Sequence, residues 1–488
     1  MFKHLTLILT FLLLFSAGKL AAQQTPRVWS LDSCINQAIS QNILVKQSEL
    51  NLQASRVTNA QAKAAFLPIS QFSGSHSYNT GRSIDPFTNQ PTTDQIQSNN
   101  FALSADLLLF NGGQLQHRLQ QSNLGLKASR YELEQTRQTV ALNVTLAYLN
   151  VLFSQELLTI AENQLKNTNL QVERSKHLVD AGALATSTLA DLEVQAAQDE
   201  LQQVTAATDL KTAQLSLLQL LNLPATTAFT IQPLATEIPA TTPYAKSTAE
   251  LVAIAEKIQP GIIGADYRVK SANRGVRAAR ASLLPSLSLG GYIGSNYSSA
   301  VPTSRFVADG TGTTTREVPS ETDFVLINGT RTPIINTRTE PNGRVENFYY
   351  FDQLEFNMRK SVGFNLSIPI LNSWQNRARL SNAIIAEKTA EYAAENARLQ
   401  LRQNMELAHN NLEAAQIRYQ TATRQVNASK IAYDAAQKRF ESGSVHYVDL
   451  NLAKTNYDKA LSNQVQAKYD YLFRERVLDF YLQDTTAK

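Results

Sequence analysis

The sequence is poor in several features that assign chains to common protein classes. It has one cysteine, Cys34, so no internal disulfide can form and no disulfide framework holds the fold. Its charges nearly balance, with 45 Lys and Arg against 41 Asp and Glu, and no basic or acidic block stands out. This balance excludes a polybasic nucleic-acid binder. With 15 prolines and 19 glycines in 488 residues, the chain is also not of low complexity.

Motifs of catalytic or metal sites are missing as well. The six histidines are scattered, and no Cys/His spacing suits a metal ion. The fragment Gly310-Thr311-Gly312 does not follow a predicted strand, so we expect no phosphate-binding loop there. No base lies reliably near Cys34, which we expect to be a small buried side chain. We therefore predict no enzymatic activity, no cofactor and no metal.

Long hydrophobic runs are confined to the start of the chain. Residues 1–22 combine a positively charged beginning, an apolar run from Leu5 to Phe15 and small residues, which predicts a secretory signal peptide cleaved after Ala22. Beyond residue 22 no stretch approaches about 18 consecutive apolar residues, so we predict no transmembrane helix. An exported chain of this kind is periplasmic, extracellular or a β-barrel, whose alternating strands escape a hydropathy scan.

What the sequence does contain is an internal duplication. The segment Ala64-Ala65-Phe66-Leu67-Pro68 matches Ala281-Ser282-Leu283-Leu284-Pro285 at an offset of 217 residues. Farther along, Leu109-Phe110-Asn111 matches Ile370-Leu371-Asn372 at an offset of 261 residues. The second copy therefore holds 44 additional residues between these two landmarks. A chain with this self-similarity is two copies of one unit, not three independent domains.

Each copy is predicted to contain a helix, two strands, a long helix and a returning helix. The first repeat covers residues 29–223, the second covers 246–482, and a proline-containing linker at 224–245 joins them. The elements of the first repeat are expected as strands 68–79 and 99–110, long helix 112–180 and helix 186–221. Those of the second are expected as strands 285–297 and 353–370, long helix 373–441 and helix 447–481.

The predicted strands alternate between apolar and polar residues. In the second copy Leu354, Phe356, Val362 and Phe364 alternate with polar residues over the whole of 353–370. Period two over about ten residues is what a membrane-crossing barrel strand needs. A soluble antiparallel sheet with one face on a core is the alternative. The run Phe348-Tyr349-Tyr350-Phe351 indicates an interfacial aromatic girdle or, alternatively, a core cluster of a soluble sheet.

The long helices carry apolar residues at sevenfold spacing, which predicts coiled-coil-like packing. About 70 residues at 1.5 Å each give a helix of about 100 Å. Gly182 and Gly443 suit the left-handed caps at which these helices end. The spaced residues are Leu119, Leu126, Leu133, Val140, Val144, Val151, Leu158, Leu165, Val172 and Val179 in the first copy, and Met405, Leu412, Tyr419, Val426, Tyr433 and Phe440 in the second.

Four strands are too few to close a membrane barrel. The smallest such barrels have about eight strands. An open strand edge in lipid leaves backbone groups unpaired, at a cost of several kcal/mol each. At least two chains must therefore share one barrel, and the symmetry of that assembly would extend the packing of the helices into a tube.

These features together resemble the TolC-type outer membrane efflux proteins over residues 29–482. The resemblance rests on the duplicated unit and on four segments: the strand entries at 66–68 and 284–285, Leu109–Gly113, and the turn Gly443–Leu450. The opening Ser30–Ile35 is similar to the form common in Bacteroidetes members. The resemblance implies a mainly α fold with a β-barrel part. Long antiparallel coiled-coil helices form an α-helical tunnel, and four strands per chain join a twelve-stranded trimeric transmembrane β-barrel.

The resemblance also implies a function as the outer-membrane exit duct of a tripartite efflux or type I secretion system. Small molecules or proteins pass through it passively. An inner-membrane efflux pump or ABC exporter drives them through a periplasmic adaptor, the membrane fusion protein. The barrel lies in the outer membrane and the helical part in the periplasm. A soluble periplasmic coiled-coil adaptor or structural protein is the alternative, although it explains the helices and not the four alternating strands.

By the same resemblance, two turns form the adaptor-docking tip, and helix residues near them constrict the aperture. The family uses acidic rings and polar links there. Asp449 stands at one ring position and Leu452 replaces the acid of the other, whereas Phe440, Val445 and Thr188 replace members of the links. We expect a constriction ringed by Asp449 with apolar packing around Phe440; a solvated carboxylate at a helix N-terminus is the alternative for Asp449. The tip residues are Ala181, Gly182, Ala183, Leu184, Ser442, Gly443, Ser444 and Val445.

Two long loops complete the predicted architecture. Residues 80–98 and 298–352 are expected to face the outside of the cell. The second holds the 44 additional residues and is rich in Thr, Asn, Pro and Arg, so we expect it to be mobile and to cap the barrel.

Overall fold

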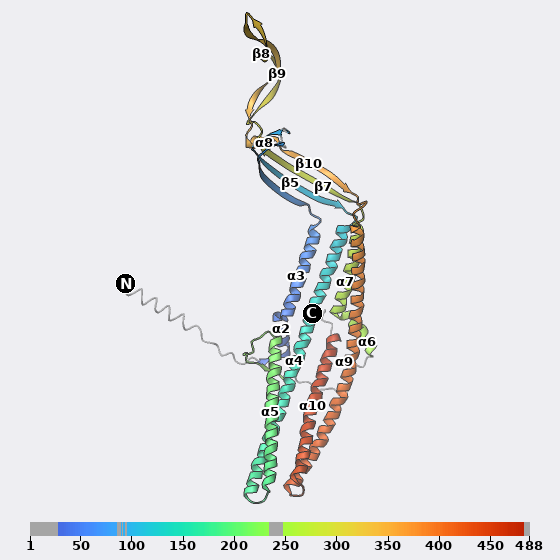
Figure 1. Cartoon of the computed structure of the whole chain (residues 1–488). Helices are drawn as coiled ribbons and strands as arrows, with labels where there is room; N and C mark the ends of the chain where they lie inside the picture. The colour runs from blue at the N-terminus through green and yellow to red at the C-terminus, as the bar shows by residue number, and fades with distance from the viewer. Residues whose placement is uncertain (1–27, 85–88, 90, 93–94, 234–246, 483–488) are drawn as a thin grey trace, which may run out of the picture. The chain divides into compact units, whose positions relative to one another are not determined.

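A computed structural model describes residues 28–84, 89, 91–92, 95–233 and 247–482 (Figure 1). The predicted signal peptide and much of the predicted linker lie outside these described residues. The chain divides into two compact units. The helical unit comprises Met1–Asn59, Gln120–Asn273 and Ile384–Lys488, and the strand unit comprises Ala60–Leu119 and Arg274–Ala383. Both repeats contribute to both units, because each repeat passes from helix to strands and back.

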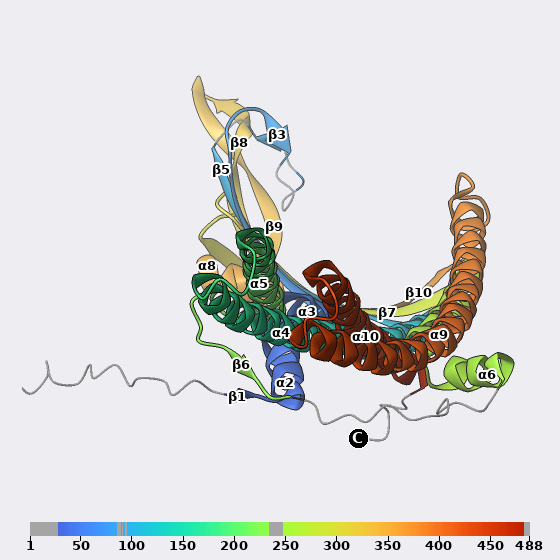
Figure 2. The same cartoon turned by 90° about the horizontal axis from the view of Figure 1, so that it is seen from below.

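The helical unit is built around two antiparallel helix pairs. The helix α4 (Gln114–Asp180) turns into α5 (Thr186–Leu220), and α9 (Gln375–Glu441) turns into α10 (Tyr447–Leu482). Figures 1 and 2 show α4 beside α5 and α9 beside α10. At 67 residues each, α4 and α9 are about 100 Å long. The remaining helices are α2 (Leu31–Gln41), α3 (Ile43–Ala64), α6 (Thr248–Ile258) and α7 (Pro260–Ala281).

The apolar core of the helical unit gathers where the shorter helices meet the long ones. Cys34, Ala38 and Ala255 from α2 and α6 are fully buried there, together with Val144 and Val151 of α4. The expectation that Cys34 is buried is confirmed. Burial raises the pKa of its thiol to about 11, so the reactive thiolate is scarce near neutral pH.

Two short strands near this core were not predicted from the sequence. The strand β1 (Val28–Trp29) pairs in parallel with β6 (Thr230–Ile231), which falls inside the predicted linker. The buried Tyr148 hydroxyl on α4 lies 3.1 Å from the carbonyl oxygen of Trp29 and 2.5 Å from that of Gln232. The first residues described therefore attach to the end of the first repeat.

The sevenfold pattern on α4 changes character along the helix. Val144 and Val151 are buried as predicted, but Leu158, Leu165, Val172 and Val179 are only half-buried. The buried positions beyond residue 152 are small or polar instead, because two helices that approach closely leave little room for branched side chains. They are Ser154, Ala161, Thr168 and Ser175 on α4. On α5 the buried Asp199, Ala206 and Ala213 recur at the same spacing after the larger Leu192.

One helix meets the length and composition criteria for a membrane span. Within α4 an 18-residue window has a mean hydropathy of 1.4, and 44% of that window is buried inside the protein. This criterion concerns length and composition only, so it does not test the prediction that the mature chain has no transmembrane helix. The finding is weak support for a span, because core helices of soluble proteins also meet the criterion.

The strand unit contains a four-stranded antiparallel sheet. Its order is β10 (Arg359–Ser367), β7 (Ser286–Ser298), β5 (Ile96–Phe110) and β2 (Ile69–Asn79). The two strands of each repeat pair with each other, and β5 joins β7 to connect the repeats. Among the described residues, β10 and β2 each have one edge without a strand partner.

The sheet has one apolar face and one polar face. Residues directly opposite each other on neighbouring strands share a face, so the register assigns every side chain to one of them. The apolar face carries Phe72, Phe101, Leu103, Leu107, Leu289, Ile293, Val362, Phe364 and Leu366. The polar face carries Gln71, Ser73, Asn100, Ser104, Asp106, Asn296, Ser361 and Asn365.

The strand predicted at 353–370 is wrong in its first part. Tyr350–Phe356 forms the helix α8, and β10 begins only at Arg359. The Tyr349 amide donates to Asp352 Oδ2 at 2.8 Å, and through this bond the Asp352 carboxylate caps the start of α8. The buried Gln353 accepts from the Ser298 amide at 3.2 Å. Such local polar contacts outweigh an alternating pattern over a few residues.

The expectation of a loop at 298–352 is also wrong. Residues Ser304–Ile327 form strand β8 and Thr330–Asn347 form strand β9, paired as an antiparallel ribbon. The turn between them is Asn328-Gly329, with φ of 48° and 79°. Two consecutive positive φ angles favour Asn-Gly and join strands with little splay. A second, short hairpin pairs β3 (Ser83–Ile84) with β4 (Pro91–Thr92) inside the region predicted as loop 80–98.

Gly112 lies between β5 and α4, and the packing of this turn against Ala281 and Leu284 at the end of α7 can be tested. The φ of Gly112 is +64°, and a Cβ there would lie 2.7 Å from Leu284 Cβ and 3.0 Å from the carbonyl oxygen of Ala281. Gly443 has a similar φ of +75° with nothing within 4 Å of its would-be Cβ. We expect Gly112→Ala to lower stability by more than the roughly 1 kcal/mol expected for Gly443→Ala, since it adds a steric clash to the same backbone strain. Thermal denaturation in detergent measures both, and equal losses would contradict the packing.

Candidate functional site

The turn between α4 and α5 and the turn between α9 and α10 have the same hydrogen-bonded geometry. In the first, the Gly182 amide donates to Val179 O at 2.9 Å and the Ala183 amide to Leu178 O at 2.8 Å. In the second, Gly443 and Ser444 repeat these two bonds at 3.0 and 2.9 Å. A glycine with positive φ followed by such a pair of bonds is the Schellman cap. The duplication therefore builds the same tight end twice.

A cavity of about 360 Å³ lies between the two turns, within the helical unit. Its wall is mixed. Phe440 and Tyr447 pack edge to face with ring centroids 6.2 Å apart. Arg174 and Glu441 form an ion pair at 3.2 Å that joins α4 to the end of α9. Both helix pairs line the cavity with Leu178, Leu184, Thr188, Phe440, Val445 and Tyr447.

The structure separates the four predicted aperture residues into two groups. Phe440 and Thr188 line this cavity together, although they come from different repeats. Asp449, the third residue of α10, and Leu452 are both exposed, and neither lines the cavity. The eight predicted tip residues also divide into two groups. Four of them line the cavity: Ala183, Leu184, Gly443 and Val445. The other four lie exposed on the turns: Ala181, Gly182, Ser442 and Ser444.

A buried polar network lies farther along the helices and joins the two pairs. The Lys454 ammonium on α10 lies 3.2 Å from Asp199 on α5 and 2.9 Å from Asp458. Asp199 also accepts from Thr168 of α4 at 2.5 Å and from Gln195 at 2.8 Å. A buried charge is tolerated only when it is paired and hydrogen-bonded in this way. This set is named the Lys454 network below.

Opposing effects set the pKa values in the Lys454 network. Burial lowers the pKa of Lys454, but the hydrogen bonds and charges of Asp458 and Asp199 outweigh it and leave the pKa above its usual value. Burial raises the pKa of Asp458, and its bond to Lys454 only partly offsets that rise. The ammonium therefore stays charged near neutral pH, and its bond and charge oppose the rise that burial causes in the pKa of Asp458.

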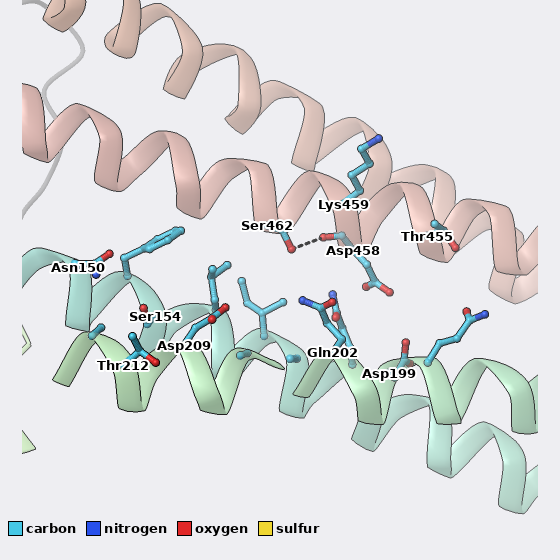
Figure 3. A pocket seen from close by; sticks show the side chains of 18 of the residues that line it. Asn150, Ser154, Asp199, Gln202, Asp209, Thr212, Thr455, Asp458, Lys459 and Ser462 are labelled. Atoms are coloured by element: carbon cyan, nitrogen blue, oxygen red, sulfur yellow. Dashed lines mark hydrogen bonds between the residues drawn. The ribbon is translucent and has the colours of Figure 1, made fainter. Parts of the chain in front are cut away.

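A larger cavity of about 650 Å³ adjoins the Lys454 network between α4, α5 and α10 (Figure 3). Carboxylate, amide and hydroxyl groups share its wall with apolar side chains such as Phe153, Leu157 and Ile160. Of the charged residues, Asp199 and Asp209 come from α5, and Asp458 and Lys459 come from α10. Within the described part of the chain, no cluster of three or more His, Cys, Asp or Glu residues suits a metal ion.

Comparison with known families agrees with this geometry. The model of the outer membrane efflux protein family matches residues 34–223 and 357–482, which is most of the chain and falls in both repeats. The chain belongs to the outer membrane efflux protein family. The resemblance inferred from the sequence is thereby confirmed, and so is the outer membrane localisation with a helical periplasmic part.

Individual relatives of this outer membrane efflux protein are distant in sequence. It is 23% identical over 273 residues to the outer membrane efflux protein BepC of Brucella suis biovar 1 (strain 1330). That alignment covers 56% of each chain, so this efflux protein spans little more than half the length of the curated relative it matches.

Solved structures share its fold. CusC superimposes with a TM-score of 0.72 at 16% identity, over 93% of this chain and 91% of that one. VceC of Vibrio cholerae gives 0.71 at 14% identity, over 93% and 95%. At such identities the likeness concerns the fold alone, and it confirms the predicted class of long helices combined with strands.

Sequence analysis of this efflux protein did not find the Lys454 network. Asp199 follows Leu192, and Lys454 follows Tyr447, at sevenfold spacing, so both occupy positions where a coiled coil places its core. A polar residue at such a position is the signal that could have revealed them. The two helix pairs are far apart in sequence, and their relative shift along the helix axes decides which charges meet. The periodicity of the sequence does not determine that shift.

We expect Lys454→Met to loosen the junction between the helix pairs. Removing the ammonium leaves the buried Asp199 and the half-buried Asp458 without their cation, which costs about 3 kcal/mol. Hydrogen exchange of the first turns of α10 should then accelerate by about a hundredfold. Lys459→Met, at an exposed position five residues on, should change exchange little.

The same variant has a predictable pH dependence. Without the ammonium, the pKa of Asp458 in the folded protein rises further above its unfolded value, so folding takes up a proton there. The defect should be full at about pH 8 and smaller at about pH 5, where the folded state holds that proton. A defect that grew on acidification would contradict this account.

Proposed function

We propose that this chain is one subunit of a trimeric exit duct through the outer membrane. The observation that carries the proposal is the open, two-faced sheet. Val362, Phe364 and Phe72 on its apolar face are exposed by 79%, 72% and 68% in the single chain. Contact with water at so many neighbouring apolar residues is unfavourable, and lipid is the solvent that suits them.

The strand edges support assembly from several chains. The outer edges of β10 and β2 carry unpaired backbone groups, which cost several kcal/mol each in lipid. A ring in which β10 of one copy pairs with β2 of the next removes every open edge. Three copies give twelve strands, with the polar face turned to a water-filled lumen.

The helical unit supports a periplasmic tunnel as the other part of the duct. Helices of about 100 Å have far more surface than one chain buries, and large apolar residues such as Ile385, Tyr392 and Ile417 on α9 are exposed. Neighbouring copies would cover these residues. Transport through such a duct is passive, so energy would come from an inner-membrane efflux pump or ABC exporter through a periplasmic adaptor.

The two turns remain our proposal for the adaptor contact. Their residues Ala181–Leu184 and Ser442–Val445 are small or short and lie at the end of the helix pairs, where a partner reaches backbone as well as side chains. Phe440 and Thr188 are proposed to close the tip through the cavity they share. Asp449 and Leu452 would face the aperture from the first turns of α10.

A soluble periplasmic adaptor or structural protein is the alternative function. It would need a core or partner over the apolar face of the sheet. The exposed side chains there follow the alternation of membrane strands, and that observation favours the duct.

Reconstitution tests the proposal directly. Full-length protein purified in mild detergent should have the mass of a trimer and form conducting channels in a planar lipid bilayer. Phe364→Lys places a charge on the apolar face at a cost of about 2–4 kcal/mol per chain and should prevent stable insertion. A monomeric protein, or one that leaves membranes without detergent, would refute the duct.

Asn365→Lys is the matched control. Asn365 neighbours Phe364 but pairs with Ser288 on the polar face. Insertion should be retained, and only the charge of the lumen should change. If both lysine variants inserted equally well, the assignment of the two faces would be wrong.

The aperture proposal has its own test. Asp449→Ala should lower cation over anion selectivity in single-channel recordings, because a ring of three carboxylates raises the local cation concentration. Glu173→Ala, which removes an exposed acid from α4, should leave selectivity nearly unchanged. Unaltered selectivity in Asp449→Ala would exclude this ring as the constriction.

A further inference from the structure

The ribbon of β8 and β9 is the most unusual feature of the strand unit. It occupies Ser304–Asn347, and at about 3.3 Å per residue its longer strand could reach about 80 Å. Figure 1 shows it as a two-stranded extension beyond α8. Its base is anchored, because the Phe348 amide donates to Thr303 O at 2.7 Å and the Arg305 guanidinium stacks on Phe356 at 4.2 Å.

Beyond this base, no other described part of the chain forms a second layer on the ribbon. Nearly all of its residues are exposed on both faces. An isolated two-stranded hairpin is only marginally stable in water. A ribbon of this length therefore needs packing that the single chain does not supply.

Apolar residues are concentrated at the far end of the ribbon. Six large side chains there are exposed by between 41% and 63%, whereas the middle of the ribbon is mostly Thr, Arg and Glu. The six residues form what we call the apolar tip: Phe324, Val325, Leu326, Ile327, Ile334 and Ile335. Phe324 and Leu326 share one face of the ribbon and Val325 and Ile327 the other, and exposed apolar residues gathered at one end in this way mark an interaction surface.

The ribbon is poorly suited to bind a partner by strand addition. Pro319, Pro333 and Pro341 lack the backbone donors that a new strand would use. The pairing register also breaks between Ala308 and Thr313 and between Pro319 and Phe324. Prolines and bulges on free edges prevent edge-to-edge pairing. Binding must therefore use the side chains of the apolar tip.

The charge pattern of the ribbon fits a second copy of this chain better than an anionic surface. Residues 304–347 contain five arginines, no lysine and six acids, a net charge of −1. No basic patch is available for acidic lipid headgroups. Asp323 precedes the apolar tip on β8, and Arg331 on β9, which pairs with Leu326, stacks on Phe324 at 4.3 Å. Opposite charges beside one apolar cluster are complementary between identical copies.

We propose that the apolar tips of three ribbons pack against one another above the pore and form a cap of three copies. The inference rests on the proposed trimer, which places three ribbon bases around one axis. The ribbons then converge from their separate bases to a shared tip. Each tip supplies the second layer that the others lack, and Arg331 of one copy lies near Asp323 of the next.

Disulfide trapping tests the cap in the full-length protein. Cys34 is fully buried, so an introduced thiol is the only reactive one. Leu326→Cys, oxidised with copper phenanthroline in intact cells, should give covalent dimers from up to two of every three chains, since three thiols around an axis form one disulfide. Thr315→Cys, in the middle of the ribbon, should give few, because the ribbons are still apart there.

Three outcomes would overturn the cap. A Leu326→Cys protein that stays uncrosslinked while its thiol reacts freely with a soluble maleimide would place the tips apart. A thiol that reacts only after extraction from cells would indicate that another surface molecule covers the tip. Equal crosslinking of both variants would indicate ribbons joined along their length. The mass of the purified assembly is measured separately, so failure of the trimer itself is distinguishable from failure of the cap.

Discussion

The open edges of a sheet with one apolar face constrain the rest of this structure. The apolar face must be covered, either by helices of the same chain or by lipid. In lipid, every backbone group of the strands must also have a hydrogen-bond partner. Four strands with free edges on β10 and β2 meet neither requirement alone. Assembly around an axis meets both, and it also provides copies to cover the long helices and the ribbon. The proposed duct, tunnel and cap thus depend on the same edge pairing.

The helical unit meets a different requirement, because it must hold two long helix pairs together near their proposed tip. Small residues such as Ala161 and Ala206 let the helices approach closely, which gives many weak contacts. The Lys454 network adds a directional link between α5 and α10. A buried ion pair contributes little net stability but penalises every misaligned arrangement. Such a link defines the stagger of the helix pairs without making their separation prohibitively costly.

Much of the fold could be predicted because it repeats or alternates. The offset between the two copies and the period-two strands indicated the fold class before any coordinates. Errors arose where local polar contacts overrule a pattern, as in α8, where Asp352 caps a helix inside a predicted strand. The ribbon was missed because its strands alternate poorly and face no core. For the site, Phe440 and Thr188 do meet, but the cavity between them arises from the packing of both helix pairs.

By itself, the sequence determined the duplicated unit, the family, the length of the helices and the alternation of the strands. Each of these depends on residues close together in the chain or on a fixed period. Only the tertiary structure decided which face of the sheet each residue joins across β5 and β7, which charges surround Lys454, and that the inserted residues form a ribbon with an apolar tip. These features depend on the register between distant segments, where a shift of one residue changes every contact.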